Sequence, residues 1–173
     1  MQTEYSKEQQ LFRLVVARAL KDKSPPSAVR VLMGSDQGYD PAVWQQLCGD
    51  MGLAGTHIPE AYGGAGFGPI ELGIVAEEMG RTLYCGPFFA SPVMAGFALL
   101  NAATEEHKKA LLPGIASGST LATLVLDDLN DPDRAGRSIH ATDQGALTGT
   151  AGIVVDAQVA ELLIVVARTT HGR

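Results

Sequence analysis

Few side chains in this sequence are of types and spacings that could carry acid–base or nucleophilic chemistry. Glu77 and Glu78 are adjacent on a predicted helix, where neighbouring residues point in different directions, so they do not form an acid–base pair. We interpret them as part of a polar helix face. Ser91 lacks a nucleophile-elbow motif and precedes Pro92, which indicates a helix N-cap. The residues therefore predict no covalent mechanism.

The sequence also predicts no metal site and no phosphate loop. His57 has no second histidine or cysteine at ligand spacing, and we interpret it as a packed or partly exposed loop residue. The acidic stretch 127–133 lacks the ligand alternation of a calcium loop, which favours a solvated turn. The glycine run 63–68 does not follow a buried strand, as a dinucleotide-binding loop would. We interpret it as a tight bend between helices.

Composition and charge narrow the class of protein. A net charge of -6 and a pI near 5.1 argue against a nucleic-acid partner, because that class of binding uses clustered lysine and arginine. Hydrophobic residues make up 46% of the 173, which is typical of a globular protein. Cys48 and Cys85 form no metal or redox motif, and the apolar run 162–167 is too short to cross a bilayer. We expect a cytoplasmic protein without membrane insertion.

Helices that would position these residues are predicted throughout the first two thirds of the chain. A capping box of Ser6 and Gln9 predicts a helix to about residue 20. Its apolar face is expected at Leu11, Leu14, Val15 and Ala19. A helix at Pro69 is expected to turn Leu72, Val75, Ala76 and Met79 inward. Other helices are predicted at Ser27–Met33, Asp40-Pro41, Ser91-Pro92 and Thr104, the last ending at Pro113.

The periodicity changes after residue 118. Apolar and β-branched runs predict strands at 120–126, 146–150, 153–155 and 162–167. The fold class expected is α+β, with an all-α domain over 1–117 and a partial antiparallel β domain over 118–173. So few strands leave unpaired sheet edges, and we expect either that the natural chain continues past Arg173 or that a partner completes the sheet.

Segments 44–47, 51–53, 58–60, 62–66 and 75–80 resemble, in order and spacing, the N-terminal domain of the acyl-CoA dehydrogenase family. Segment 104–118 resembles the family's connection into its central β domain, and segment 149–169 resembles the strand pair that follows. The resemblance implies a helical domain, a β domain and, in complete members, a second helical domain, with FAD held between domains and across a subunit contact. We expect that last domain, which carries the catalytic glutamate, to be absent from this chain. No catalytic residue is therefore expected here.

The resemblance also implies where FAD would be contacted. Family members usually have Leu-Thr-Glu-Pro where this chain has the stretch that starts at Leu126, and Trp-Ile-Thr/Ser where it has 153–155. A valine at 155 cannot donate a side-chain hydrogen bond to a reduced flavin. The cofactor-binding residues that the resemblance implies are Leu124, Val125, Leu126, Asp127, Ile153 and Val155.

The resemblance places the substrate at four further residues, Phe88, Phe89, Val93 and Asp133, with the apolar three suited to an acyl chain. It implies a FAD-dependent enzyme that oxidises an acyl-CoA thioester and that forms a homo- or hetero-oligomer. A second hypothesis is a degenerate, non-catalytic subunit that completes or stabilises a partner's flavin site. A third is a free-standing helical interaction module.

Overall fold

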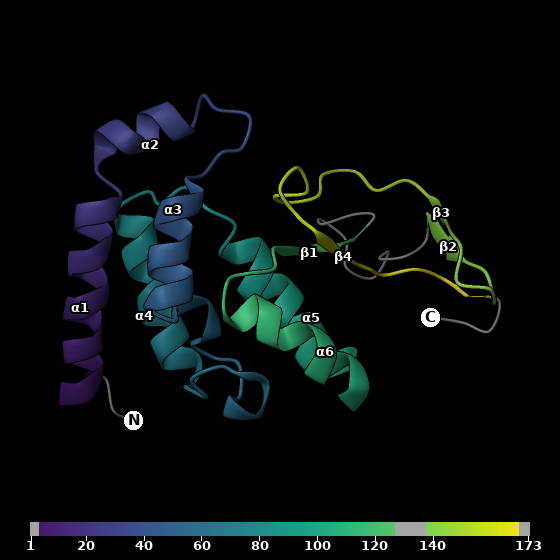
Figure 1. The fold of residues 1–173 in the computed structure, drawn as a ribbon, viewed down its shortest axis with the longest axis horizontal. Coiled ribbons are helices and arrows are strands. Elements are labelled where there is room, and N and C mark those ends of the chain that lie inside the picture. Colours follow the sequence, from purple (N-terminus) through teal and green to yellow (C-terminus); the bar gives the residue numbers. More distant parts are fainter. Residues whose placement is uncertain (1–3, 127–137, 170–173) are drawn as a thin grey trace.

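The computed structural model describes residues 4–126 and 138–169. Helices occupy one end of the molecule and strands the other, as Figure 1 shows. Among the described residues, every helix lies between Lys7 and Ala116, and every strand lies between Ala122 and Val165. The predicted α+β fold class is confirmed by this arrangement.

Helix α1 (Lys7–Lys23) begins at the predicted capping box and packs against α4 (Pro69–Arg81). The Ser6 hydroxyl accepts from Gln9 N at 3.2 Å, and the Gln9 side chain accepts from Ser6 N at 3.0 Å. The predicted apolar face is wrong at Leu11, Leu14 and Val15, which are exposed, whereas Ala19 packs against the core as predicted. The buried face instead carries Val16 and Leu20. Gln9 and Arg13 lie in line with this face and donate hydrogen bonds to Glu71 and Glu78 of α4.

Helix α2 (Pro26–Leu32) is followed by α3 (Pro41–Trp44), which continues into a π-helical segment, η1 (Gln45–Asp50). The Asp40 carboxylate caps α3 as predicted, accepting from Ala42 N and Val43 N at 2.8 and 3.2 Å. Gly52, with φ of 71°, ends this run. The Trp44 indole donates to the carbonyl of Gly118 at 2.8 Å and so connects the end of α3 to the start of the β part.

The glycine run bends sharply, as predicted. Two short helices precede it, η2 (Leu53–Gly55) and η3 (Glu60–Tyr62). Gly63 has a φ of 82°, in the left-handed region that favours glycine. A Cβ on Gly64 would overlap the carbonyl of Ile58, so the two backbone segments approach closely only because residue 64 has no side chain. The run positions the start of α4.

The second helical layer contains η4 (Phe89–Ala95), α5 (Gly96–Ala102) and α6 (Glu105–Ala116). Thr104 caps α6 by accepting from His107 N at 3.3 Å, as predicted. Two predictions for this layer are wrong. Ser91 lies inside η4 and does not cap it, and Pro113 lies inside α6, which continues for a further turn. Pro113 has no backbone N–H, so α6 loses one hydrogen bond there. Burial of Leu112, Ile115 and Ala116 nevertheless stabilises the last turn.

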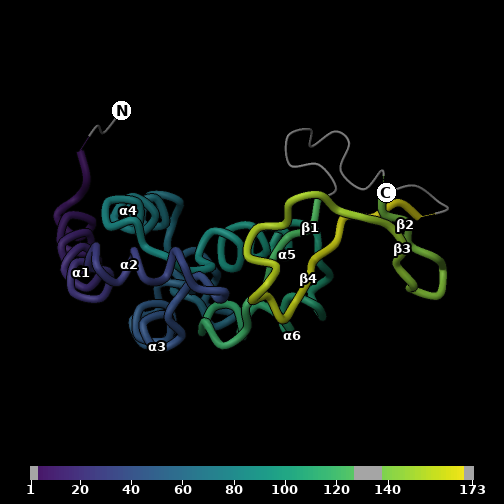
Figure 2. Tube along the Cα trace, turned by 90° about the horizontal axis from the view of Figure 1, so that it is seen from above, coloured from purple at the N-terminus to yellow at the C-terminus, as the bar shows by residue number. Residues whose placement is uncertain are grey.

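Two pairs of strands follow. Strands β1 (Ala122–Val125) and β4 (Leu162–Val165) pair in parallel, whereas β2 (Ile139–Ala141) and β3 (Leu147–Gly149) pair antiparallel. The predicted antiparallel pairing thus holds for β2 and β3 and is wrong for β1 and β4, which a long connection brings together in the same direction (Figure 2). The sequence pattern missed β2. The predicted strand at 153–155 is not formed.

The hydrophobic core consists of two clusters. One joins α1, η1 and α4 through residues such as Val16, Leu47 and Val75. The other joins η4, α5, α6 and β1 through residues that include Leu99, Leu112 and Ala122. Leu121 packs in the first cluster and its neighbour Ala122 in the second, because successive residues of extended chain face opposite sides. The start of β1 therefore connects both cores.

Candidate acyl and cofactor site

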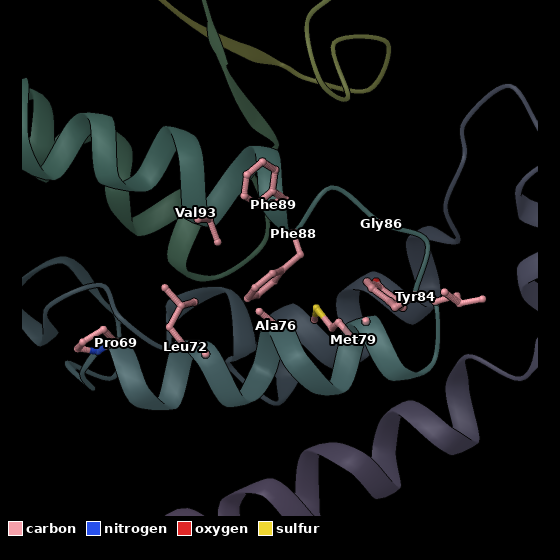
Figure 3. Close-up of a pocket in the computed structure, with 12 residues that line it drawn as sticks. Pro69, Leu72, Ala76, Met79, Tyr84, Gly86, Phe88, Phe89 and Val93 are labelled. Atoms are coloured by element: carbon pink, nitrogen blue, oxygen red, sulfur yellow. The ribbon is translucent and has the colours of Figure 1, made fainter. Parts of the chain in front are cut away.

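An apolar pocket of about 500 Å³ lies between α4 and the segment that runs from Leu83 to Val93. Gly73, Ala76 and Gly80 form its floor on α4, and the larger side chains of Leu72 and Met79 line it beside them. Figure 3 shows Phe88 extending from the opposite segment toward Ala76 and Met79. A volume of this size is in the range of ligand sites for small organic molecules.

Local sequence explains how α4 presents this floor. Pro69 occupies the first turn, and the Glu71 carboxylate accepts from Gly68 N at 3.0 Å, which starts the helix. Leu72, Val75 and Met79 face the core, so the small residues at 73, 76 and 80 fall on the outer face by helical periodicity. Ala76 is therefore exposed, which corrects its predicted inward position.

The structure brings three of the four predicted substrate residues to this pocket. Phe88 is buried, Phe89 is 60% exposed, and Val93 lies one turn further along η4. Asp133 lies outside the described residues. The sequence analysis did not select Gly73, Gly80, Leu83 or Tyr84 as pocket residues. The sequence feature that could have identified them is the spacing of Gly73 and Gly80, which lie two helical turns apart on α4.

The pocket can hold an apolar group, but it offers little proton chemistry. None of the described residues that line it is charged. The Tyr84 hydroxyl is buried and has no hydrogen-bond partner among the described residues. Burial raises the pKa of Tyr84, so its hydroxyl keeps its proton. A general base must come from elsewhere.

The predicted cofactor residues fall in two segments that the structure places side by side. Leu124 and Val125 belong to β1, and Leu126 follows it. The buried Thr123 hydroxyl donates to the carbonyl of Val155 at 2.7 Å, which holds the later segment against β1. The Ile153 side chain is 82% exposed. Asp127 lies outside the described residues.

These residues fit an isoalloxazine ring in part. The five described side chains at 124–126, 153 and 155 are all aliphatic, but Leu124 and the buried Val125 face opposite sides of β1, so only some of them could pack on the flat faces of one ring. Their side chains offer its polar edge no hydrogen-bond donor. The nearest hydroxyl, on Thr123, is already donated to Val155. Backbone groups or another polypeptide would have to satisfy that edge.

Glu77 and Glu78 form a structural ion network and not an acid–base pair. Glu78 is buried, which corrects its predicted place on a polar helix face. Its carboxylate accepts from Arg13 Nε at 2.7 Å and lies 3.3 Å from Arg81 Nε. Glu77 pairs with the same two arginines at 2.9 and 2.7 Å. The hydrogen bond from Arg81 lowers the pKa of Glu77. The network joins α1 to α4.

His57 is buried between the glycine loop and α5. Its ring stacks on Phe97 with centroids 4.5 Å apart, and among the described residues neither ring nitrogen has a hydrogen-bond partner. Burial lowers the pKa of His57, an effect that the backbone of Pro92 partly offsets. Within residues 4–126 and 138–169, no cluster of histidine, cysteine, aspartate and glutamate could hold a metal ion. The predicted packed histidine is confirmed.

Comparisons with known proteins agree on one family. A family model described as "Acyl-CoA dehydrogenase, N-terminal domain" matches residues 6–119. Acyl-CoA dehydrogenase IpdE2 of Mycobacterium tuberculosis is 40% identical over 120 residues, which is 69% of this chain and 37% of that protein. The probable acyl-CoA dehydrogenase YngJ of Bacillus subtilis is 32% identical over 177 residues, which is 98% of this chain and 45% of that protein. The chain thus spans less than half the length of these relatives.

Solved structures share the fold. A subunit of the ChsE4-ChsE5 complex from Mycobacterium tuberculosis superposes with a TM-score of 0.85 and 27% identity over 99% of this chain and 47% of that one. A variant of the Tcur3481-Tcur3483 steroid ACAD gives a TM-score of 0.84 and 28% identity over 96% of this chain and 46% of that one. In the part of the chain that the structure describes, no helix is long and apolar enough to span a membrane.

Proposed function

Because the chain belongs to the acyl-CoA dehydrogenase family, we propose that it contributes the acyl-binding pocket to a FAD-dependent assembly that oxidises an acyl-CoA thioester between its α and β carbons. The observation that carries this proposal is the apolar pocket that Phe88, Phe89 and Val93 line against α4. Its apolar lining suits a hydrocarbon group. Asp133 is proposed as a further substrate contact.

In this proposal, the chain's own residues bind the acyl group, and they do not transfer protons. Removal of the α proton is assigned to a group outside the pocket lining, because none of the described residues that line the pocket is charged. FAD, when bound, supplies the hydride-accepting chemistry. The residues proposed to contact it are Leu124, Val125, Leu126, Asp127, Ile153 and Val155.

A second candidate function is a non-catalytic subunit that completes the flavin site of a partner. The observation that favours it is the aliphatic set at 124–126, 153 and 155, which leaves the polar edge of a flavin to be satisfied by other groups. The similar ChsE4-ChsE5 structure is itself a complex of two proteins. In this case, the chain would acquire flavin only together with its partner.

We place the reaction in a reducing cytoplasm. Cys48 and Cys85 are both free thiols in the structure. Cys48 is buried, and burial raises the pKa of its thiol, so it stays protonated and unreactive. A compartment that preserves free thiols agrees with both cysteines.

The test is purification of the complete protein alone and together with coexpressed subunits of the same family. Flavin absorbance and acyl-CoA-dependent dye reduction are measured with decanoyl-CoA and with a steroid-acid CoA thioester, so that a linear and a fused-ring acyl group are compared. Flavin in the protein alone supports the enzyme, and flavin only in the mixed assembly supports the non-catalytic subunit. Neither flavin nor dye reduction in any preparation would contradict both.

A pocket-filling variant tests the site itself. Gly73→Leu places a side chain into open space on the pocket floor, since a Cβ there meets no atom within 4 Å. We expect this variant to lose acyl-CoA binding while it keeps its fold. Ala42→Leu is the matched control, because it adds the same side chain type at an exposed helical position on α3. Unchanged binding by Gly73→Leu would rule out this pocket as the acyl site.

A further inference from the structure

A second hollow, of about 560 Å³, lies between α2 and the C-terminal ends of α1 and α4. We call it the α2 hollow. The buried Ser24 and Val29 line it, as do Met33 and Leu83, which are 75% and 71% exposed. Figure 1 shows α2 at the helical end of the molecule, away from the strands. The α2 hollow is therefore separate from the proposed flavin contacts.

The α2 hollow carries positive charge that no carboxylate in its lining balances. Three cationic residues line it, Lys21, Arg30 and Arg81, and none of the described residues in the lining is acidic. Arg81 is already paired, with Glu77 at 2.7 Å and with Glu78 at 3.3 Å. Lys21 and Arg30 form no ion pair with any residue in the described part of the chain. An anion bound here would meet two cations that lack a counter-charge.

The walls of the α2 hollow are held in place without a ligand. Pro25 and Pro26 lie side by side in the lining, and each proline ring fixes the backbone φ of its own residue. The Ser24 hydroxyl donates to the carbonyl of Thr82 at 3.5 Å and so joins the end of α1 to the end of α4. A ligand that enters a preformed hollow orders few protein groups, which favours binding.

Cations beside an apolar lining favour an amphiphile with a negatively charged head. Val29, Met33 and Leu83 provide apolar contact for a hydrocarbon chain, and covering the last two would remove exposed apolar surface from water. A guanidinium such as that of Arg30 binds a carboxylate through two hydrogen bonds. The volume is in the range of sites for small organic molecules. A membrane surface or a nucleic acid is disfavoured, because the whole chain has a net charge of -6.

We propose that the α2 hollow is a binding site for a fatty-acid carboxylate, separate from the acyl pocket. Lys21 and Arg30 bind the carboxylate, and the hydrocarbon chain lies against Val29, Met33 and Leu83. Leu83 borders both sites, but Lys21, Arg30 and Val29 do not line the acyl pocket. The inference therefore does not depend on the proposed function.

The test measures decanoate binding by calorimetry in the complete protein, alone and with any family subunits that copurify. Gly73→Leu serves as the background, because it fills the acyl pocket and leaves the α2 hollow unchanged. We expect Gly73→Leu to bind decanoate. In this background, Arg30→Gln should weaken binding about tenfold by removing a charge-assisted hydrogen bond. Met33→Gln should weaken it about fivefold by removing apolar contact. Decyltrimethylammonium, which has the same chain and a positive head, should not bind.

Arg18→Gln is the matched control, because Arg18 is exposed on α1 and does not line the α2 hollow. It should bind decanoate normally. Arg30 is exposed and has no ion pair among the described residues, so Arg30→Gln should keep the thermal midpoint of its background. If Gly73→Leu does not fold, Arg30→Gln and Arg18→Gln are compared in the unsubstituted protein, where the same order is expected.

Three results would overturn the proposal. The first is decanoate binding that is absent, or that is equal in Arg30→Gln and Arg18→Gln. The second is decyltrimethylammonium binding as tight as that of decanoate, which would show that the two cations do not select the ligand. The third is decanoate binding that the chain alone shows and that copurified subunits abolish, which would assign the α2 hollow to a protein interface. None of these results bears on acyl-CoA binding, which the unsubstituted protein and Gly73→Leu test separately.

Discussion

The Ser91 hydroxyl oxygen lies 3.0 Å from the backbone nitrogen of Ala122 and accepts its hydrogen bond. Ser91 belongs to η4 and is fully buried, whereas Ala122 is the first residue of β1. The same hydroxyl donates to the carbonyl of Thr120 at 3.5 Å. One helical side chain therefore satisfies the backbone where the chain leaves the helices and enters the sheet.

Ser91→Ala should destabilise this junction. The substitution leaves the buried amide of Ala122 without its partner, and we expect the free energy of unfolding to fall by about 1–3 kcal/mol. Chemical denaturation measures this change. Ser119→Ala is the control, because Ser119 is exposed and its loss should cost less than about 0.5 kcal/mol. Equal effects of the two substitutions would contradict the bridging role.

Glu78→Gln should weaken the attachment of α1 to α4. The buried carboxylate accepts from Arg13 at 2.7 Å, and a neutral amide cannot replace the charge-assisted bond. We expect the free energy of unfolding to fall by about 1–3 kcal/mol. Glu77→Gln should have a smaller effect, because that carboxylate is more exposed and solvent screens it. Denaturant titrations of both variants test this order, and a larger loss in Glu77→Gln would refute it.

His57 should make stability depend on pH below neutrality. Burial lowers its pKa in the folded protein, so the unfolded chain binds a proton more readily. Its contribution is fully present above the unfolded pKa of about 6.5 and is lost as pH falls toward the lower folded pKa. In that window, the unfolding free energy should drop by at most about 1.4 kcal/mol per pH unit. His57→Phe should remove this slope in denaturation curves collected between neutral and mildly acidic pH. A slope that persists in the variant would assign it to other groups.

Two glycine substitutions should have opposite signs. In Gly64→Ala, the added methyl group meets the carbonyl of Ile58, a backbone group that cannot move aside, and we expect a loss of about 3 kcal/mol. In Gly73→Ala, the methyl group meets open space within a helix and should stabilise the protein by about 0.5–1 kcal/mol. Thermal unfolding monitored by circular dichroism compares them. Two losses of similar size would contradict the close approach at Gly64.

The sequence by itself determined those features whose chemistry is complete within a few residues. The caps at Ser6, Asp40 and Thr104 form as predicted, because each side chain satisfies amides two or three positions further along the chain. The bend at the glycine run was also predictable, since only glycine tolerates its conformation. The order of short motifs was sufficient to indicate the family, which the comparisons confirm.

Only the tertiary structure decided the features that depend on distant partners. The apolar residues of α1 form two overlapping helical stripes, and packing against the rest of the core decided that Val16 and Leu20 are buried while Leu11 and Leu14 are exposed. Segment 153–155 does not form a strand, and the carbonyl of Val155 accepts a hydrogen bond from the Thr123 hydroxyl. The pocket needs α4 and the chain that returns across it after Leu83. Such contacts are set by packing between elements, and no local periodicity encodes which surfaces meet.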